Sequence, residues 1–341
     1  MPKVSVVVPN YNHARYLRQR IQSVLDQTFQ DFDLTYLDDA SSDESNAVFA
    51  EFEPQPRIKA IYNESNSGSP FKQWNKGFRA TEGEYVWIAE SDDVADPNFL
   101  ARLVPMLDDN PNVGIAYSQS CQIDSNNVVF EPTLLQWVED LDPDRWEHNF
   151  VANGIIECQK YLVFRNTIPN ASAVLIRRSV YESIGGAEES LFLTGDWITW
   201  IRILLKSDLA FCAQTLNCFR SHRTSVRSRS VLNGKQAYEH LLIRDFIEKH
   251  VAISFSILTK AKEEIVADWI NLIFDPENTS DIQDRMKFYR LAKKIIPQTE
   301  LIFLKQLANY CRNKLAVKIK KWLPESAIAA LKELKLNAKS S

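Results

Sequence analysis

The stretch Tyr85-Val86-Trp87-Ile88-Ala89-Glu90-Ser91-Asp92-Asp93 is an apolar run that ends in acidic residues. A strand without polar positions is typical of one buried on both faces of a sheet. Adjacent carboxylates repel each other and resist desolvation, so the acidic end needs a positive partner. Hard cations such as Mg²⁺ and Mn²⁺ take oxygen ligands of this kind. The alternative is an ordinary acidic loop before the next helix, with Asp96-Pro97 at the helix start.

Composition and charge limit the class of protein. The chain has 341 residues, 45% of them hydrophobic and 25% charged, with 9 Gly and 14 Pro, as in ordinary globular proteins. A net charge of −4 gives no case for nucleic-acid binding, so no nucleic acid is expected as a partner. The five cysteines are never spaced as Cys-x-x-Cys, which argues against a disulfide framework or zinc site and favours the cytoplasm. Neither a signal peptide nor a transmembrane helix is expected.

Strands and helices are predicted to alternate through the first part of the chain. Apolar runs predict strands, and apolar residues at helical spacing predict helices. The strands are 4–8, 32–37, 57–62, 84–89, 114–118, 171–176 and 209–213, and the helices are 15–27, one starting at 42, 71–80, 97–107 and 196–205. Short alternating elements indicate βαβ units and a parallel sheet. Strands are absent from about residue 235 onward, so a domain boundary is expected near residue 230.

Four blocks of the first half resemble the family 2 glycosyltransferases. The blocks are VSVVVPNYN at 4–12, SVLDQT at 23–28, LDDASSD at 37–43 and GEYVWIAESDD at 83–93. The resemblance implies a GT-A-like α/β nucleotide-binding sandwich with a mostly parallel central sheet. It implies a catalytic domain over residues 1–230, with a nucleotide-sugar half at 1–118 and an acceptor half at 119–230. The helical C-terminal region, 231–341, lies outside the resemblance.

The resemblance also implies an activity. Family members move a sugar from a nucleotide sugar, here expected to be a UDP-sugar, to a hydroxyl of a glycan or lipid-linked glycan with inversion. Single displacement needs one general base and no carboxylate nucleophile. The resemblance assigns that base to Asp196, although Asp at a predicted helix start is also a good N-cap. Family members often have Glu-Asp at this point, whereas Gly195 precedes Asp196 here.

The nucleotide is expected at the ends of the first strands. The resemblance places it against Pro9 and Tyr11, with Asp92 near the ribose hydroxyls. An aromatic ring such as that of Tyr11 can stack on any base, so discrimination is assigned to Asp39, whose carboxylate would accept the imide N–H of uracil. Tyr11 is equally suited to packing, and Asp39 to capping or turn formation.

The resemblance further implies Mn²⁺ or Mg²⁺ as cofactor, held by Asp93 and completed by His222. Such a cation neutralises charge on a departing nucleotide diphosphate. A direct ligand role is not expected for Glu90. Candidates for the donor cleft are Gly68, Trp74, Lys76 and Arg220. A simple turn explains the glycine nearly as well, packing explains the tryptophan, and a lone histidine is usually an ordinary surface or core residue.

The sequence leaves two alternative functions, each with a feature that distinguishes it. A nucleotidyltransferase is expected to have a Gly-rich loop with Arg or Lys after the first strand, where Pro9-Asn10-Tyr11-Asn12 stands instead. A catalytically inactive nucleotide-sugar-binding module would not need to retain Asp39, Asp92, Asp93 and Asp196 together.

The C-terminal region carries a concentration of positive charge. Residues 284–321 contain eleven Lys or Arg and two acids, a net charge of +9 in a chain whose total is −4. Such asymmetry predicts a partner for the basic part. Basic and apolar residues on one helix, with a tryptophan near its end, predict that 284–323 makes peripheral contact with an anionic membrane. The expected location is the inner face of the cell membrane. The alternative is a bundle that packs on the catalytic domain, with solvated lysines.

Overall fold

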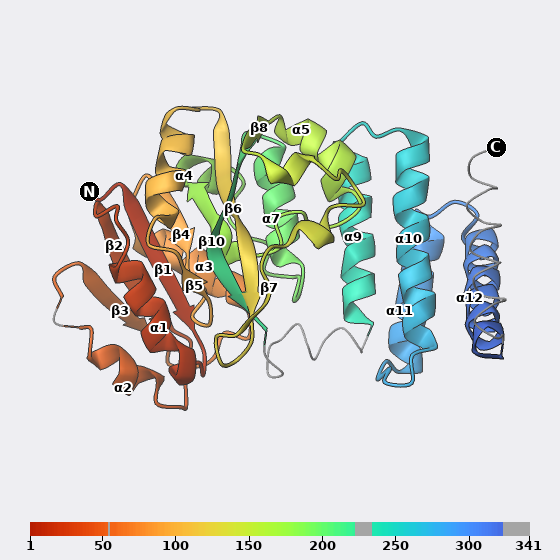
Figure 1. The fold of residues 1–341 in the computed structure, drawn as a ribbon, viewed down its shortest axis with the longest axis horizontal. Helices are drawn as coiled ribbons and strands as arrows, with labels where there is room; N and C mark the ends of the chain where they lie inside the picture. The colour runs from red at the N-terminus through yellow and green to blue at the C-terminus, as the bar shows by residue number, and fades with distance from the viewer. Residues whose placement is uncertain (54, 222–233, 323–341) are drawn as a thin grey trace. The chain divides into compact units, whose positions relative to one another are not determined.

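A computed structural model describes residues 1–53, 55–221 and 234–322, with side chains to residue 314 (Figure 1). The chain forms two compact units. The first comprises residues 1–231 and 242–258, and the second comprises 232–241 and 259–341. Helix α9, Lys235–His250, contributes residues to both.

The first unit is built on one sheet in the order β3-β2-β1-β4-β9-β6-β10-β5, with β7 on β6 and β8 on β10. The strands are β1 (Val4–Asn10), β2 (Phe32–Asp38), β3 (Ile58–Tyr62), β4 (Tyr85–Ile88), β5 (Val94–Ala95), β6 (Val113–Ile123), β7 (Val129–Glu131), β8 (Phe150–Ala152), β9 (Val174–Arg177) and β10 (Asp208–Arg220). Parallel pairing joins β3, β2, β1 and β4, and it joins β6 to β10. Strand β9 runs antiparallel to both β4 and β6. The predicted α/β class is confirmed, and the sheet is mixed beyond β4.

Helices lie between the strands: α1 (Ala14–Leu25), α2 (Ser45–Ala50), α3 (Pro70–Ala80), α4 (Phe99–Asp108), α5 (Gly154–Glu157), α6 (Arg178–Ser183) and α7 (Gly195–Leu204). Helices were predicted at the positions of α1, α2, α3, α4 and α7, whereas α5 and α6 were not predicted. Two predicted strands are longer in the structure: β6 continues to Ile123 and β10 to Arg220. These strands pair with each other through register shifts, which accommodate polar residues that interrupt the apolar pattern.

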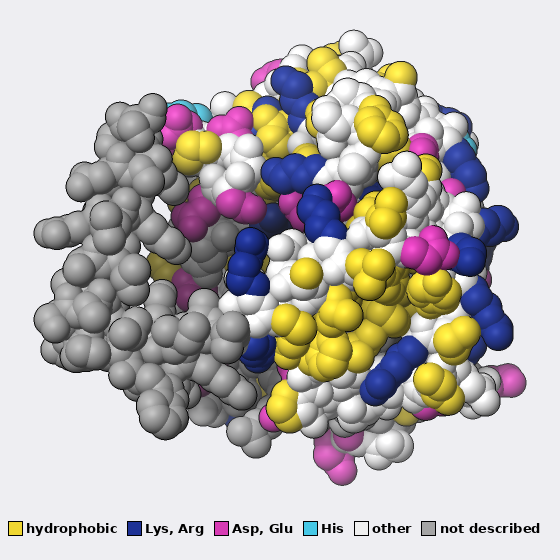
Figure 2. Space-filling model, turned by 90° about the vertical axis from the view of Figure 1, so that its right-hand side faces the viewer, with side chains coloured by type: hydrophobic (Ala, Val, Ile, Leu, Met, Phe, Trp, Pro, Cys, Tyr) yellow, Lys and Arg dark blue, Asp and Glu magenta, His cyan; other side chains and the backbone are white. Residues whose placement is uncertain are grey.

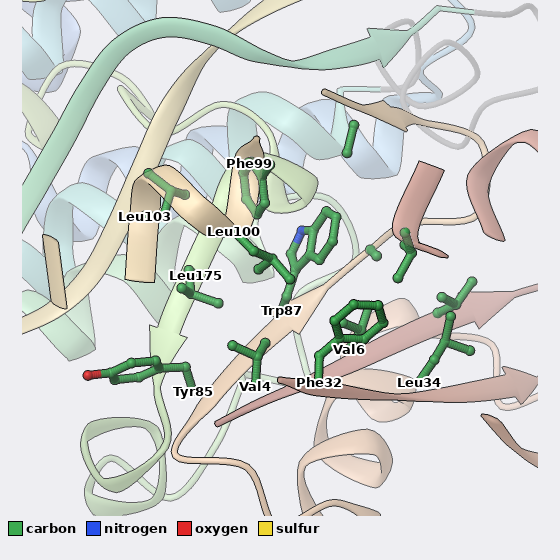
Figure 3. Packing of buried hydrophobic residues seen from close by; sticks show 14 of the residues in the cluster. Val4, Val6, Phe32, Leu34, Tyr85, Trp87, Phe99, Leu100, Leu103 and Leu175 are labelled. Atoms are coloured by element: carbon green, nitrogen blue, oxygen red, sulfur yellow. The ribbon is translucent and has the colours of Figure 1, made fainter. Parts of the chain in front are cut away.

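The core of the first unit surrounds β4 (Figure 3). Trp87 stacks on Phe99 of α4, with ring centroids 4.4 Å apart, and both side chains are fully buried. Val4 and Val6 of β1 and Leu175 of β9 belong to the same cluster. Burying each side chain of this size contributes about 1.5–3 kcal/mol. This packing holds β4 in the middle of the sheet, so the acidic residues that follow it emerge at a defined edge.

Three parallel strands end at that edge. In the register, Asn10 pairs with Asp38, so β1 and β2 end level, whereas Ile88, the last residue of β4, pairs with Val7, three residues before the end of β1. Because β9 is antiparallel to β4, its first residue, Val174, lies at the same edge. In open α/β sheets ligands bind beyond the carboxyl ends of the strands.

The second unit is helical and contains most of α10 (Phe255–Ile273), α11 (Ile282–Ile295) and α12 (Thr299–Trp322). Trp269 stacks on Phe288 with centroids 4.7 Å apart, and Phe303 meets the tryptophan edge-on. None of the helices in the described ranges combines the length and apolarity needed to cross a bilayer. Figure 2 shows apolar side chains gathered on the face that carries α11 and α12, with Lys and Arg near them.

Candidate functional site

The acidic loop after β4 is buried against charged and polar partners. The Glu90 carboxylate accepts a hydrogen bond of 2.8 Å from the indole of Trp74. Burial raises the pKa of Glu90 to about 8, and the charges of Asp92 and Asp93 add to the shift. Burial likewise raises the pKa of Asp93 to about 6, again with a contribution from Asp92. The negative charge of this loop is therefore incompletely compensated.

Asp93 is held from two sides. Its Oδ1 accepts a 2.8 Å bond from the backbone N–H of Arg220, and the Ser172 hydroxyl donates to its carboxylate. The same hydroxyl accepts the backbone N–H of Glu90. Asp93 is 2% exposed, whereas Asp92 is half-buried. Of the two aspartates at this strand end, Asp92 is thus more open to a ligand.

Arg220 does not have the position expected of a donor-cleft residue. It is 2% exposed, and its guanidinium donates to the carbonyl oxygens of Asp92 and Asp124 at 2.6 and 2.8 Å. A third bond, of 3.0 Å, reaches Gln19. The guanidinium therefore supports the acidic loop from inside the protein. The sequence did not reveal this, because an arginine at the end of a strand is usually exposed.

Arg20 also contacts the acidic loop, although it is not among the site residues predicted from the sequence. This residue of α1 is fully buried, and its Nε donates to the carbonyl oxygen of Glu90 at 2.8 Å. Its guanidinium lies 5.3 Å from the Trp87 ring centroid. Burial lowers the pKa of Arg20, and the charges of the acidic loop oppose that shift. The available signal was an arginine one position before Ile21, on the apolar side of a predicted helix.

These carboxylates fit a hard cation in chemical type. Asp92 and Asp93 supply carboxylate oxygens beside negative charge that Arg20 only partly compensates, and such oxygens are the ligands that Mg²⁺ and Mn²⁺ prefer. Within the described part of the chain, no group of three metal-binding side chains is assembled. His222, the other predicted ligand, lies outside the described residues.

Asp39 organises the loop after β3. It is 5% exposed. Its Oδ1 accepts bonds from the side chains of Asn63 and Gln73, at 2.6 and 2.9 Å, and from the backbone N–H of Ser67 at 2.9 Å. Its Oδ2 accepts the Ser67 hydroxyl at 2.7 Å. Oδ2 has the smaller number of partners among the described residues, so it is the oxygen better placed to accept a further donor.

Of the residues at the ends of β1 and β2, one is exposed to solvent and two are buried in the fold. Tyr11 is 48% exposed beyond the end of β1, so its ring is available for stacking. Pro9 is buried within β1, which continues to Asn10 instead of ending at the proline as predicted. Asp38 is structural: its carboxylate accepts from Asn10, the Tyr36 hydroxyl and the backbone N–H of Ser41.

The remaining donor-cleft candidates have different environments. Gly68 has φ +72° in an exposed turn, a conformation that glycine adopts without strain. Lys76 is half-buried and donates to Asn63. Trp74 is 2% exposed and packs near Trp200 with centroids 5.7 Å apart. Packing and the bond to Glu90 therefore account for Trp74, and it offers no face to a ligand.

Asp196 lies in the first turn of α7, one residue beyond the start of the helix. The residue before the helix is Thr194, so Asp196 is not the N-cap. Its Oδ1 accepts the backbone N–H of Trp197 at 2.7 Å, and its Oδ2 accepts the side chain of Asn166 at 2.9 Å. The carboxylate is half-buried and held in one orientation. A general base needs this combination of access and orientation.

The glycine before Asp196, Gly195, lies where the structure leaves no room for a side chain. A Cβ at this position would lie 2.4 to 2.7 Å from three ring atoms of Phe71 on α3. Contacts this short do not occur in real structures, so a larger residue would have to displace the ring. The glycine therefore lets α7 approach α3 closely, which brings Asp196 toward the edge where β4 ends.

An α/β sheet with acidic side chains at the carboxyl ends of parallel strands is typical of nucleotide-binding enzymes. The family model described as "Glycosyl transferase family 2" matches residues 5–185. The chain belongs to this family.

Relatives with curated sequences include an uncharacterized glycosyltransferase of Nostoc sp., 36% identical over 186 residues, which are 53% of each chain. The poly(ribitol-phosphate) beta-N-acetylglucosaminyltransferase TarS of Staphylococcus aureus is 24% identical over 81% of this chain and 49% of its own. The chain thus spans about half the length of these two relatives. An uncharacterized glycosyltransferase of Rickettsia prowazekii is 24% identical over 95% of this chain and 97% of its own.

Solved structures with the same fold include S. aureus TarS 1–349 in complex with UDP-GlcNAc, with a TM-score of 0.65 and 14% identity over 89% of each chain. The mannosyltransferase PcManGT of Pyrobaculum calidifontis, in complex with GDP-Man and Mn²⁺, has a TM-score of 0.57 and 14% identity, over 89% of this chain and 84% of its own. These likenesses support the GT-A fold expected from the sequence.

Proposed function

We propose that this protein transfers a sugar from a nucleotide sugar, expected to be a UDP-sugar, to a hydroxyl of a glycan or lipid-linked glycan. The configuration at the anomeric carbon is inverted in this reaction. The observation that carries the proposal is the shared edge of the sheet. Asp39 follows β2 and the acidic loop follows β4, and the carboxyl ends of both strands point to the same edge as that of β1. The edge thus offers a place for a base at Asp39 and for a cation-bound diphosphate at Asp92 and Asp93.

The proposed reaction is a single displacement. The acceptor hydroxyl oxygen attacks the anomeric carbon, the bond from that carbon to the diphosphate oxygen breaks, and the nucleoside diphosphate leaves with the electron pair. The hydroxyl proton passes to Asp196, which Asn166 and the Trp197 N–H hold in orientation. One carboxylate is sufficient, because attack from the face opposite the leaving group inverts the configuration without a covalent intermediate.

The proposed cofactor is Mn²⁺ or Mg²⁺, held by Asp92 and Asp93. When bound, such a cation would neutralise charge on the diphosphate. The chain's own contribution is to keep the loop in place: Arg220 bonds the Asp92 carbonyl, and Ser172 bonds Asp93. The raised pKa values of Glu90 and Asp93 support a cation here, because added positive charge would relieve the repulsion.

A thermal-shift screen of nucleotide sugars, with and without Mn²⁺, tests the proposal. A ligand that binds the native state raises its apparent stability by RT ln(1 + [L]/Kd), about 2.7 kcal/mol at a hundredfold excess over Kd. We expect a UDP-sugar to give the largest rise and EDTA to remove most of it. Absence of a rise with every nucleotide sugar, in the presence of Mn²⁺, would reject the proposal.

The basic helical region supports a second proposal, that it brings the enzyme to an anionic membrane surface. Leu301 and Leu304 of α12 are 62% and 63% exposed, and Ile282 of α11 is 70% exposed. Lys305 follows Leu304 in the chain and pairs with Glu263 at 2.8 Å, and Lys314 follows further along α12. Exposed apolar side chains flanked by lysines fit the interface between lipid headgroups and acyl chains. The part of this region from 315 onward lacks described side chains, so the support comes from 282–314.

A further inference from the structure

A small cavity lies in the first unit, under the segment that follows β6. It has a volume of about 20 Å³, which is room for about one water-sized group. Its walls come from β6, from the turn that carries Trp137 and from the segment around Thr167 and Asn170. All of its lining residues lie between 117 and 211, so it is built without residues of the first three βα units.

Three residues that line the cavity each have a buried side-chain atom without a hydrogen-bond partner among the described residues. The atoms are Oγ of Ser118, Oγ1 of Thr167 and Nδ2 of Asn170. Their residues are 3%, 2% and 5% exposed. An unpaired buried polar group costs about 1–3 kcal/mol, so three around one cavity need an occupant. Two hydroxyls and an amide N–H₂ match an oxygen that both accepts and donates hydrogen bonds.

Hydrogen bonds connect this cavity to Asp196. The Trp137 indole, on the cavity wall, donates to the carbonyl oxygen of Asn166 at 2.9 Å. The Asn166 side chain donates in turn to Asp196 at 2.9 Å. Thr167 directly follows Asn166 in the chain, so a group held by its hydroxyl is close to the segment that orients Asp196.

The cavity is also connected to the acidic loop. Asn170, on its wall, accepts the backbone N–H of Ser172 at 2.7 Å. The Ser172 hydroxyl then meets the backbone N–H of Glu90 and the carboxylate of Asp93. The segment 166–172 therefore runs between the residues proposed as base and as cation ligands, with the cavity beside it.

We propose that this cavity is an acceptor subsite, which binds one hydroxyl or hydroxymethyl group of a polyhydroxylated acceptor through Ser118, Thr167 and Asn170. This inference rests on the proposed function and adds the specificity for the acceptor. The volume admits one such group and excludes a sugar ring, so the ring or polyol chain bearing it extends outward. An acceptor anchored in this way presents its neighbouring hydroxyl on the side of Asp196.

The test measures how the enzyme divides a nucleotide sugar between water and small polyols. The wild type is incubated with the nucleotide sugar that gives the largest thermal shift, with glycerol, ribitol or methyl β-D-glucopyranoside as surrogate acceptor. Mass spectrometry gives the ratio of polyol glycoside to free sugar. Thr167→Val and Ser118→Ala each remove one hydroxyl. Thr167→Ser keeps the hydroxyl and serves as rescue.

Thr35→Val is the matched control. Thr35 is 1% exposed and its hydroxyl is also unpaired among the described residues, but it lies in β2 and not on the cavity wall. Thr35→Val therefore makes the same chemical change at the same burial. Thermal melting of every variant checks that the fold is retained, and Ser118→Ala remains informative if Thr167→Val does not fold.

We expect Thr167→Val and Ser118→Ala to lower the ratio of glycoside to free sugar about 3- to 10-fold, the usual effect of one lost hydrogen bond. For Thr167→Val and Ser118→Ala, the rate of donor hydrolysis without polyol and the affinity for UDP should equal those of the wild type. For Thr167→Ser and Thr35→Val, the ratio of glycoside to free sugar should also equal that of the wild type. An unchanged ratio would overturn the subsite, and so would a wild type that hydrolyses the donor but glycosylates none of the polyols. A selective loss of affinity for the nucleotide sugar, with UDP affinity intact, would place the donor sugar in the cavity instead. Failure of the wild type to bind any nucleotide sugar is a separate result, and it would reject the proposed function.

Discussion

The side-chain amide of Asn166 donates a 2.9 Å hydrogen bond to Oδ2 of Asp196, thirty residues further along the chain. A carboxylate at the start of a helix can rotate, and this bond fixes one oxygen while the Trp197 N–H fixes the other. Asn166 therefore helps to fix the orientation of the Asp196 carboxylate. Neither the spacing of the two residues nor any motif around Asn166 reveals the contact.

Asp196→Asn keeps the shape of the proposed base and removes its ability to take a proton. We expect kcat to fall by about 10²–10⁴, the usual contribution of general acid–base catalysis, with UDP affinity nearly unchanged. Steady-state kinetics and calorimetric titration with UDP measure the two quantities. A parallel collapse of UDP affinity would instead make Asp196 a binding residue.

Asn166→Ala removes the orienting bond while leaving the base in place. A hydrogen bond to a charged group contributes about 1.5–3 kcal/mol, so we expect kcat to fall about 10- to 100-fold with little change in the KM for the donor. Asn166→Asp places a second carboxylate beside Asp196 and should move the acidic limb of the pH–rate profile upward. Wild-type kinetics in both variants would show that Asn166 is not a positioning residue.

The raised pKa of Glu90 should make the stability of the folded protein depend on pH when no divalent cation is bound. The pKa of Glu90 is raised from 4.5 to about 8 in the folded protein. Between pH 4.5 and 8 the folded protein therefore keeps a proton on Glu90 that the unfolded chain has lost. Stability should fall as the pH rises from about 4.5 to 8, and Glu90→Gln should flatten that fall. Thermal melting in EDTA measures it, where about 1 kcal/mol moves Tm by about 2–4 °C. Equal slopes for wild type and Glu90→Gln would contradict the prediction.

Asp39→Ala should weaken UDP binding and also loosen the loop that Asp39 organises. The substitution leaves donors of Asn63, Ser67 and Gln73 without their acceptor, which costs about 1–3 kcal/mol for each donor that stays buried. The wild type should prefer UDP to GDP. Calorimetric titration with both nucleotides, beside a melting curve, separates binding from stability. Equal affinity of the wild type for UDP and GDP would count against uracil recognition.

Leu301→Gln combined with Leu304→Gln should reduce sedimentation with anionic vesicles at low salt. Both side chains are exposed, so the variant should keep its Tm. Val128→Gln, at a 60% exposed residue of the first unit, is the control for added polarity. Vesicles with and without phosphatidylserine, at low and high salt, distinguish apolar from electrostatic contact. If the intact protein stays in the supernatant with anionic vesicles at low salt, the membrane proposal is wrong.

Local patterns in the sequence predict the order of the first strands and helices and the acidic residues that follow the strands. The apolar runs identified β1, β2, β3 and β4. Residues of β1 and β4 are buried throughout and those of β2 nearly so, as expected of strands covered on both faces, whereas β3 has exposed positions at Lys59 and Tyr62. The same runs placed Asp39 and Asp93 after strand ends, which parallel pairing brings to one edge. These conclusions depend on local periodicity, which a sequence displays directly.

The partners of those carboxylates come from segments that are far apart in the chain and meet only in the folded protein. The candidate site contains side chains from distant parts of the chain: Arg20, Asn166 and Ser172. Arg220 is buried beneath the acidic loop and bonds the carbonyl oxygen of Asp92. Strand β9 enters the sheet antiparallel, which brings Ser172 beside Glu90. The cavity at Thr167 exists because separate segments close around it. A side chain's partners depend on contacts between residues far apart in sequence, and local patterns of hydrophobicity and turn residues carry no information about such contacts.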